Sequence, residues 1–249
     1  MPAGTAPPVR PVVASRLNGP SVPDGMPVRR RALTGAMQLT KYNHATVVLE
    51  RDGATIVLDP GTFTPEAADL VRAATAVLVT HEHFDHLDVD AVRAGLAANP
   101  ALVVRGPRPV VDQLGDHDGR VVAVEAGDSF SVGPFAVQVF GEEHAVIHRD
   151  VPVVANVGYL VDGAVFHPGD AYLAPGVPVS TLLMPTSGPW THMAEAVDHV
   201  RAVAPERVVQ IHEAMLSEVG QQSTARFLGP EMLGTVPVTI LASGESIEV

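Results

Sequence analysis

The chain of 249 residues contains no cysteine, and only 4% of its residues are aromatic. The lack of cysteine excludes disulfide bonds, thiolate nucleophiles and cysteine-rich zinc sites, so any metal ion must be bound by nitrogen and oxygen ligands. No uncharged apolar run approaches the ~20 residues of a membrane span. Hydrophobic residues still make up 46% of the chain. This composition is typical of a globular protein with a sizeable core and excludes a fully disordered chain.

Basic residues are scarce: 16 stand against 28 acidic residues, which gives a formal net charge of -12 with histidine neutral. Lys41 is the single lysine. This balance opposes binding to a long phosphate backbone, and the sequence shows no basic amphipathic helix suited to a membrane surface. We therefore expect a cytoplasmic protein with a small-molecule substrate, without nucleic-acid or membrane partners, and leave a homo-oligomer open.

The first 36 residues differ in composition from the rest of the chain. They contain seven prolines, four glycines and five arginines without apolar periodicity. Such a segment buries too little apolar surface to offset the entropy of ordering. The arginines at 29–31 are not followed by the sustained apolar stretch of an export signal. We predict a disordered extension over residues 1–36 and one domain over residues 37–249.

Short β-rich segments alternate with helical segments from residue 37 onward. Asp52-Gly53 and Asp162-Gly163 each separate two apolar segments, a pattern typical of a β-hairpin. Helices are predicted at 65–74, 88–98, 109–114, 192–204 and 213–228. The order of elements fits an α/β protein in which two sheets pack together with helices outside. Strands are predicted at 37–41, 46–50, 54–58, 76–80, 101–104, 121–124, 135–140, 156–161, 164–167, 181–184, 207–211 and 238–241.

One segment carries the strongest chemical signal, His81-Glu82-His83-Phe84-Asp85-His86, between a predicted strand and a predicted helix. Side chains two positions apart in an extended segment point the same way, so His81 and His83 can converge on one cation. Asp85 and His86 lie where the chain turns toward the helix and can point at a second cation. Imidazole and carboxylate groups are ligands that zinc, manganese and iron accept. The segment therefore predicts a metal site.

This motif resembles that of the metallo-β-lactamase superfamily of metal-dependent hydrolases, and the resemblance runs from about residue 37 to the end of the chain. It implies a four-layer αββα sandwich whose site lies where strand-to-helix loops meet at the sheet edge. The branch of ascorbate-6-phosphate lactonase-like enzymes, with actinobacterial hydrolases of unassigned substrate, is most similar. Three segments carry this likeness: Thr40-Lys41-Tyr42-Asn43-His44-Ala45-Thr46, Leu58-Asp59-Pro60-Gly61 and Phe166-His167-Pro168-Gly169-Asp170.

Two features depart from that branch. Asn43 stands where a glycine commonly precedes His44, and Pro185-Thr186-Ser187-Gly188-Pro189-Trp190 is not the usual glycine-rich run. These departures count against a sugar-phosphate substrate and leave the metal chemistry unchanged.

The resemblance also implies two divalent metal ions per chain, zinc first, with manganese or iron as alternatives. His144, Asp170 and His212 match the three ligands that the superfamily places at later strand ends. Asp85 and Asp170 are the implied catalytic carboxylates, and Asp59 is a candidate acceptor for the second N–H of a ligand histidine. The implied ligands are His81, His83 and His144 for the first ion, Asp85, His86 and His212 for the second, and Asp170 with a hydroxide for both.

Other residues are expected near the mouth of this site. Trp190 is expected either to pack in the core or to line the pocket, and His148 is an alternative to His144 as a ligand. His117 and His199 are expected at the surface. The candidates for substrate binding or proton transfer are His44, His148, His192 and Tyr172.

The leading functional prediction is a dinuclear metal-dependent hydrolase that acts on a small ester, lactone or phosphoester. Two dications ~3.5–4 Å apart lower the pKa of a water between them toward ~7, so that a bridging hydroxide is available at neutral pH. One alternative is a phosphodiesterase that acts on RNA or a lipid, which the acidic balance disfavours. The other is a di-iron redox module, since some members of the superfamily hold iron and reduce oxygen.

Overall fold

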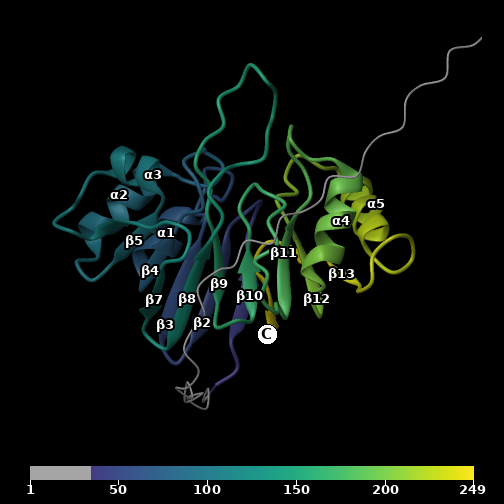
Figure 1. Ribbon diagram of the computed structural model, residues 1–249. Helices are drawn as coiled ribbons and strands as arrows, with labels where there is room; N and C mark the ends of the chain where they lie inside the picture. The colour runs from purple at the N-terminus through teal and green to yellow at the C-terminus, as the bar shows by residue number, and fades with distance from the viewer. Residues whose placement is uncertain (1–34) are drawn as a thin grey trace, which may run out of the picture. The chain divides into compact units, whose positions relative to one another are not determined.

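A computed structural model describes residues 35–249, which form two seven-stranded β-sheets (Figure 1). The first sheet has the order β14-β1-β2-β3-β4-β5-β6 and the second the order β13-β12-β11-β10-β9-β8-β7. The first sheet consists of β1 (Gln38–Lys41), β2 (Val47–Arg51), β3 (Ala54–Leu58), β4 (Ala76–Leu78), β5 (Val103–Gly106), β6 (Val121–Ala123) and β14 (Glu245–Glu248). The second consists of β7 (Ser129–Val132), β8 (Phe135–Phe140), β9 (Gly158–Val161), β10 (Val165–His167), β11 (Thr181–Pro185), β12 (Arg207–Ile211) and β13 (Val238–Thr239).

Helices cover the outer face of each sheet. The helices α1 (Ala67–Ala73), α2 (Val89–Ala98) and α3 (Arg108–Leu114) share one apolar cluster with the first sheet. The helices α4 (Met193–Val203) and α5 (Glu218–Leu228) share another with the second sheet. None of the helices within residues 35–249 is both long and apolar enough to cross a membrane. The layers of the described chain are therefore helix, sheet, sheet and helix.

The main core lies between the two sheets, because alternate residues of the strands face inward. In β8, Phe135, Val137 and Val139 are buried, whereas Ala136 and Gln138 between them are exposed. The three buried residues of β8 share one apolar cluster with Leu49 and Ile56 of the first sheet. The central strands β9 to β11 are buried at every position, as expected for strands covered on both faces.

The direction of the strands sets the position of the site. Strands β3 to β6 run parallel to one another in the first sheet, and β10 to β13 run parallel in the second. Parallel strands end at the same edge of a sheet, so the loops that follow them gather there. Asp59 follows β3, His81 follows β4, Asp170 follows β10 and His212 follows β12.

The predicted αββα fold is confirmed, and most of its elements lie within a few residues of their predicted bounds. Asp52 and Gly53 both have positive φ (48° and 77°), as in the two-residue hairpin turn that the sequence predicts. Two strands, β7 and β14, were not predicted from the sequence. The predicted start of the last helix is wrong, because α5 begins at Glu218 rather than at residue 213. The predicted extension over residues 1–36 lies, up to residue 34, outside the described residues.

Candidate metal centre

Histidine and aspartate side chains from both sheets meet at the edge where the parallel strands end. They fall into three overlapping groups whose potential ligand atoms lie within 4.8 Å of one another. The groups are His81, His83 and His144; His44, Asp85, His86 and His212; and His81, His86 and Asp170.

The first group joins a loop of the first sheet to a loop of the second. His81 and His83 lie in the loop after β4, with His81 Nε2 3.1 Å from His83 Nδ1. The ring centroid of His144, from the long loop between β8 and β9, lies 5.0 Å from that of His81 and 4.9 Å from that of His83. These three imidazoles therefore surround one small space.

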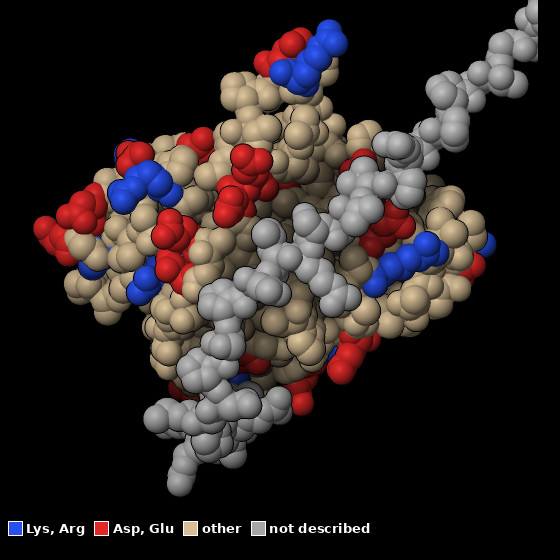
Figure 2. Space-filling model, viewed as in Figure 1, with Lys and Arg blue, Asp and Glu red and all other residues tan. Residues whose placement is uncertain are grey.

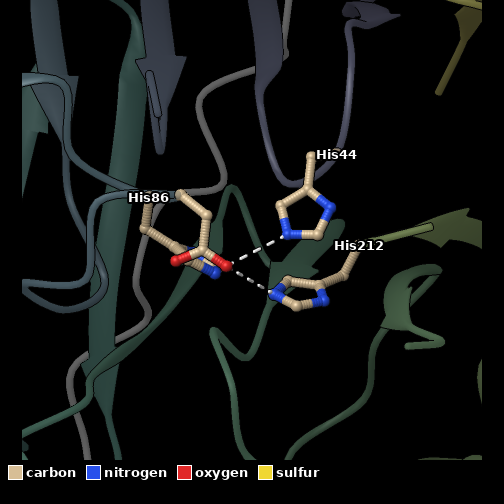
Figure 3. A group of neighbouring side chains, drawn as sticks. His44, His86 and His212 are labelled. Carbon is tan, nitrogen blue, oxygen red and sulfur yellow. Dashed lines mark hydrogen bonds and ion pairs between the residues drawn. The ribbon is translucent and has the colours of Figure 1, made fainter. Parts of the chain in front are cut away.

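The second group forms around Asp85. Its Oδ2 atom lies 3.2 Å from His44 Nε2 and 3.5 Å from His212 Nε2. Figure 3 shows His44 and His212 approaching the same carboxylate, with His86 behind it. The rings of His86 and His212 are 5.1 Å apart. Asp85, His86 and His212 are therefore close enough to share one ion.

Asp170 lies between the two groups. Its Oδ1 atom is 3.1 Å from His86 Nε2, and its Oδ2 atom is 3.1 Å from His212 Nε2 and 3.4 Å from His144 Nε2. The side chain is almost fully buried, at 4% exposure. This carboxylate is thus placed to contact ions in both groups.

The inward-facing atoms of this cluster fit metal ions. Within residues 35–249, the contacts above bring the buried atoms His86 Nε2, His144 Nε2, His212 Nε2 and Asp170 Oδ1 close together, but none of these four atoms is in a hydrogen bond. A buried polar atom without a partner is costly, and here four of them converge. Imidazole nitrogen and carboxylate oxygen are the donors that zinc, manganese and iron accept, so cations would satisfy all four.

The other ring nitrogen of most of these histidines is bonded away from the centre. His86 Nδ1 lies 2.7 Å from Asp59 Oδ2, His144 Nδ1 lies 2.5 Å from the Ala145 carbonyl, and His212 Nδ1 lies 2.5 Å from the Ser187 carbonyl. Since these acceptors take the N–H on Nδ1, Nε2 is the nitrogen that can offer a lone pair to a cation, which displaces any proton held there. From the sequence, Asp59 was expected to accept the second N–H of a ligand histidine, and its contact with His86 has the geometry that this role needs.

Comparison with known proteins identifies the family of the chain. A family model described as "Beta-lactamase superfamily domain" matches residues 38–212. The chain belongs to this superfamily.

Two relatives align with this chain over most of their own length. The Mycobacterium tuberculosis protein Rv0786c is 38% identical over 186 residues, which cover 73% of this chain and 86% of the relative. The UPF0173 metal-dependent hydrolase MK1542 of Methanopyrus kandleri is 30% identical over 231 residues, which cover 85% of this chain and 100% of the relative.

Solved structures show the same fold. Igni18 of Ignicoccus hospitalis, described as a novel metallo hydrolase, superposes with a TM-score of 0.67 at 18% identity, over 86% of this chain and 98% of that chain. CmlA, a diiron β-hydroxylase of Streptomyces venezuelae, superposes with a TM-score of 0.64 at 16% identity, over 86% of this chain and 54% of that chain. At these identities the likeness shows the metallo-β-lactamase fold alone.

At two glycines of this superfamily domain, the backbone packs too closely against residues in or beside the centre to leave room for a side chain. A Cβ atom on Gly61 would lie 1.8 Å from the Asp85 carbonyl oxygen, and one on Gly169 would lie 2.1 Å from Asn156 Oδ1. Asn156 Oδ1 in turn accepts a hydrogen bond from the Asp170 N–H at 3.0 Å. His44, Asp59 and His212 also have positive φ (59°, 45° and 57°), a backbone conformation that is costly for residues other than glycine.

Burial and neighbouring charges perturb the titration of the cluster. Burial lowers the pKa of His44 to about 4 and holds the pKa of His81 well below its usual value. Burial opposes protonation of His212 as well, but Asp170 and Asp85 raise its pKa to about 9. In Asp170, His86 and His212 outweigh burial and hold the pKa well below its usual range. The cluster thus carries protons that cations would displace.

The structure does not bring all the predicted mouth residues to the centre. His44 contacts Asp85 but is fully buried, and its Nδ1 accepts a hydrogen bond from the Ala214 N–H at 3.3 Å. His148 lies in the loop between β8 and β9 with 58% of its side chain exposed, beside Asp150. His192 is exposed at the start of α4. His144, rather than His148, is the histidine of this loop that joins the cluster.

Tyr172, which is partly buried, and His199, which is buried, lie together next to the centre. Their rings stack with centroids 5.5 Å apart, and the Tyr172 ring lies 5.0 Å from that of Trp190. The surface position expected for His199 is wrong: it is 4% exposed, because it lies on the face of α4 with Ala196 and Val203. Burial lowers the pKa of His199 to about 4 and raises that of Tyr172.

Two features of the centre were not predicted from the sequence. Trp190 Nε1 donates a hydrogen bond to Asp170 Oδ2 at 2.9 Å, so this residue both packs in the core and contacts the cluster. Lys41 pairs with Glu213, which follows His212, and both side chains are buried. The sequence offered one signal for this ion pair: the only lysine of the chain lies in a predicted strand, where a buried charge needs a partner.

Proposed function

We propose that this chain, a metal-dependent hydrolase of the metallo-β-lactamase superfamily, binds two divalent ions and hydrolyses a small ester, lactone or phosphoester. The observation that carries the proposal is the convergence of unpartnered Nε2 atoms and one carboxylate at the edge of both sheets. The superfamily match over residues 38–212 and relatives named as metal-dependent hydrolases support the class of activity.

The two ions would be held by the groups that the structure brings together. When bound, a pair of divalent ions lowers the pKa of a water molecule enough to supply hydroxide at neutral pH. The ions also stabilise the oxyanion that forms on attack. Zinc is the first expectation for this donor set, with manganese or iron as alternatives. The proposed ligands are His81, His83 and His144 for one ion, Asp85, His86 and His212 for the other, and Asp170 for both.

The two carboxylates have different access to a substrate. Asp85 keeps 17% of its side chain exposed, compared with 4% for Asp170. We assign Asp85 to hold one ion on the more accessible side of the centre and Asp170 to hold the two halves of the centre together. Neighbouring imidazoles, His212 and His44 foremost, hold the pKa of Asp85 well below its usual range, so its carboxylate is ionised at neutral pH. His44 holds the same carboxylate in place through Oδ2.

A small cavity lies beside the centre. It has a volume of about 240 Å³ and is lined by residues 141–143 and 145 on one side and 171–173 on the other, next to His144 and Asp170. Glu142 and Glu143 are its charged lining residues. Figure 2 shows acidic side chains on this face of the described chain near the loop that projects between β8 and β9. This charge favours a small substrate over RNA or an anionic lipid surface.

A panel of lactones, carboxylic esters, thioesters and phosphodiesters, tested with zinc- and manganese-loaded protein, examines the proposal. Asp170→Ala should lower kcat/KM on any accepted substrate by at least about a hundredfold, because it disturbs the shell of both ions. Asp69→Ala, which removes an exposed carboxylate from α1, is the matched control. Wild-type protein with less than about one bound metal ion per chain and no metal-stimulated hydrolysis would contradict the proposal.

The di-iron redox alternative has a separate signature. Protein purified without added metal would then show an iron absorption spectrum and consume oxygen. Relatives at 29% and 30% identity are named as metal-dependent hydrolases, whereas the diiron β-hydroxylase CmlA is similar at only 16% identity. We therefore place hydrolysis first.

A further inference from the structure

Trp190 lies in the loop after β11, within residues 186–192, and is 2% exposed. Its ring is surrounded by residues of the centre: the ring centroid lies 5.9 Å from that of His144 and 6.3 Å from that of His212. Tyr172 packs edge-on against it at 5.0 Å. The indole is therefore held in one place by rings on several sides.

The polar edge of the indole points at the carboxylate between the two ligand groups. Trp190 Nε1 donates to Asp170 Oδ2 at 2.9 Å. The same oxygen lies 3.1 Å from His212 Nε2, whereas the other oxygen, Oδ1, faces His86 Nε2 at 3.1 Å. A donor fixed on one oxygen sets the rotation of the carboxylate, so that each oxygen keeps its own side of the centre.

The backbone of this loop is shaped around the indole and His212. Gly188 has a φ of 139°, and a Cβ atom there would lie 2.8 Å from Trp190 Nε1 and 3.5 Å from His212 Cε1. Ser187, one residue earlier, accepts from His212 Nδ1 through its carbonyl oxygen. One short loop therefore orients a histidine and the shared carboxylate together.

We propose that Trp190 is a positioning residue of the metal centre, which sets the orientation of Asp170 and thereby the affinity for the ions. The inference rests on the proposed function, because it assumes that Asp170 contacts both ions. An indole N–H suits this role because it is a neutral donor that does not titrate. It orients the carboxylate without cancelling the negative charge that attracts the cations.

Trp190→Phe tests the hydrogen bond while keeping an aromatic ring in the same space. We expect zinc to bind the variant about 10- to 100-fold more weakly in competition with a chromophoric chelator, as for other losses of an outer contact to a ligand. Tyr159→Phe is the matched control, because it also removes one buried aromatic donor, bonded at 2.9 Å to the Val79 carbonyl, without contacting Asp170. Zinc affinity within about twofold of the wild type in Trp190→Phe would overturn the inference.

A second readout needs no substitution, because Trp190 is the only tryptophan of the chain. Zinc titrated into metal-free wild-type protein should change the emission of Trp190 in proportion to the ions bound. Emission that stays constant while zinc binds would contradict the inference and leave the proposed function intact. Wild-type protein that binds neither zinc nor manganese nor iron would instead contradict the proposed function, and the inference with it.

Discussion

Asp59 contacts a proposed metal ligand, His86, without being a ligand itself. Its Oδ2 atom lies 2.7 Å from His86 Nδ1, and its two oxygens accept from the Thr80 N–H at 2.7 Å and the Thr80 hydroxyl at 2.6 Å. We predict that Asp59→Asn weakens zinc binding about 10- to 100-fold, because an amide cannot accept all three bonds and disturbs the His86 tautomer. Chelator competition measures this loss.

Asp69→Asn provides the control for that prediction, since Asp69 is an exposed residue paired with Arg72 on α1. It removes the same charge from the chain and should leave zinc affinity unchanged. Equal affinities for Asp59→Asn and the wild type would show that the contact with His86 does not tune the centre.

His199 gives the chain a specific sensitivity to acid. Burial lowers its pKa to about 4, and neither ring nitrogen has a hydrogen-bond partner within residues 35–249. In the unfolded chain its pKa is about 6.5. Because the unfolded state takes up the proton first, the stabilisation is fully present above about pH 6.5 and is lost as the pH falls toward 4. The loss is on the order of 2 kcal/mol at pH 4.5.

Urea unfolding of wild-type protein and His199→Leu at pH 7.5 and 4.5 tests this prediction. The variant should lose less stability than the wild type between the two pH values, by roughly 2 kcal/mol. All other titrating groups are common to both proteins and cancel in this difference. An equal loss in both proteins would mean that His199 is protonated in the folded state or exposed.

At the scale of elements, the buried ion pair between Arg51 and Asp162 links the two sheets. Arg51, the last residue of β2, lies 2.6 Å from Asp162 in the turn between β9 and β10 and donates to the Pro134 carbonyl at 2.8 Å. Both side chains of the pair are at most 5% exposed. Arg51→Met should lower the free energy of unfolding by about 3–5 kcal/mol, because it leaves a buried carboxylate without its cation.

The exposed pair Arg72–Asp69 offers the comparison. Arg72→Met should cost less than about 1 kcal/mol in the same urea experiment, since solvent screens exposed pairs. Adding Asp162→Asn to Arg51→Met should recover part of the loss, because it removes the stranded charge. A similar cost for Arg51→Met and Arg72→Met would place the Arg51 pair in solvent.

Elements encoded by local pattern were predictable, whereas those that depend on distant partners were not. The Asp52-Gly53 turn follows from two residues that tolerate positive φ between apolar strands. Strand β14 has the polar sequence Glu245–Glu248, and it is a strand because it pairs with β1, with Glu248 opposite Gln38. No local periodicity contains that pairing.

The candidate site divides in the same way. The six residues 81–86 predict a metal site by themselves, but nothing in the local pattern around His144, Asp170 or His212 shows that they converge on it; a resemblance supplied that. The hydrogen bond between Trp190 and Asp170 joins two loops after different strands, so it required the fold. His199 was predictable in principle, since it shares a helical face with Ala196 and Val203.

At the scale of the whole molecule, the proposed ions would connect the two sheets. His81, His83, Asp85 and His86 follow β4 of the first sheet, whereas His144, Asp170 and His212 come from loops of the second. An ion bound only by the native chain stabilises it by about 4 kcal/mol at a thousand times its dissociation constant. For a domain of this size that corresponds to roughly 8–16 °C in Tm.

We therefore predict that a chelator lowers the Tm of the protein by about 10 °C and that added zinc restores it. Calorimetry measures the shift, and hydrogen exchange shows where it acts. Because each ion would have ligands from both sheets, protection should fall in the loops after β4 and after β12 together. In Asp170→Ala, which lacks the shared carboxylate, zinc should raise Tm much less. Loss of protection on one sheet alone would mean that the ions do not join the two halves of the fold.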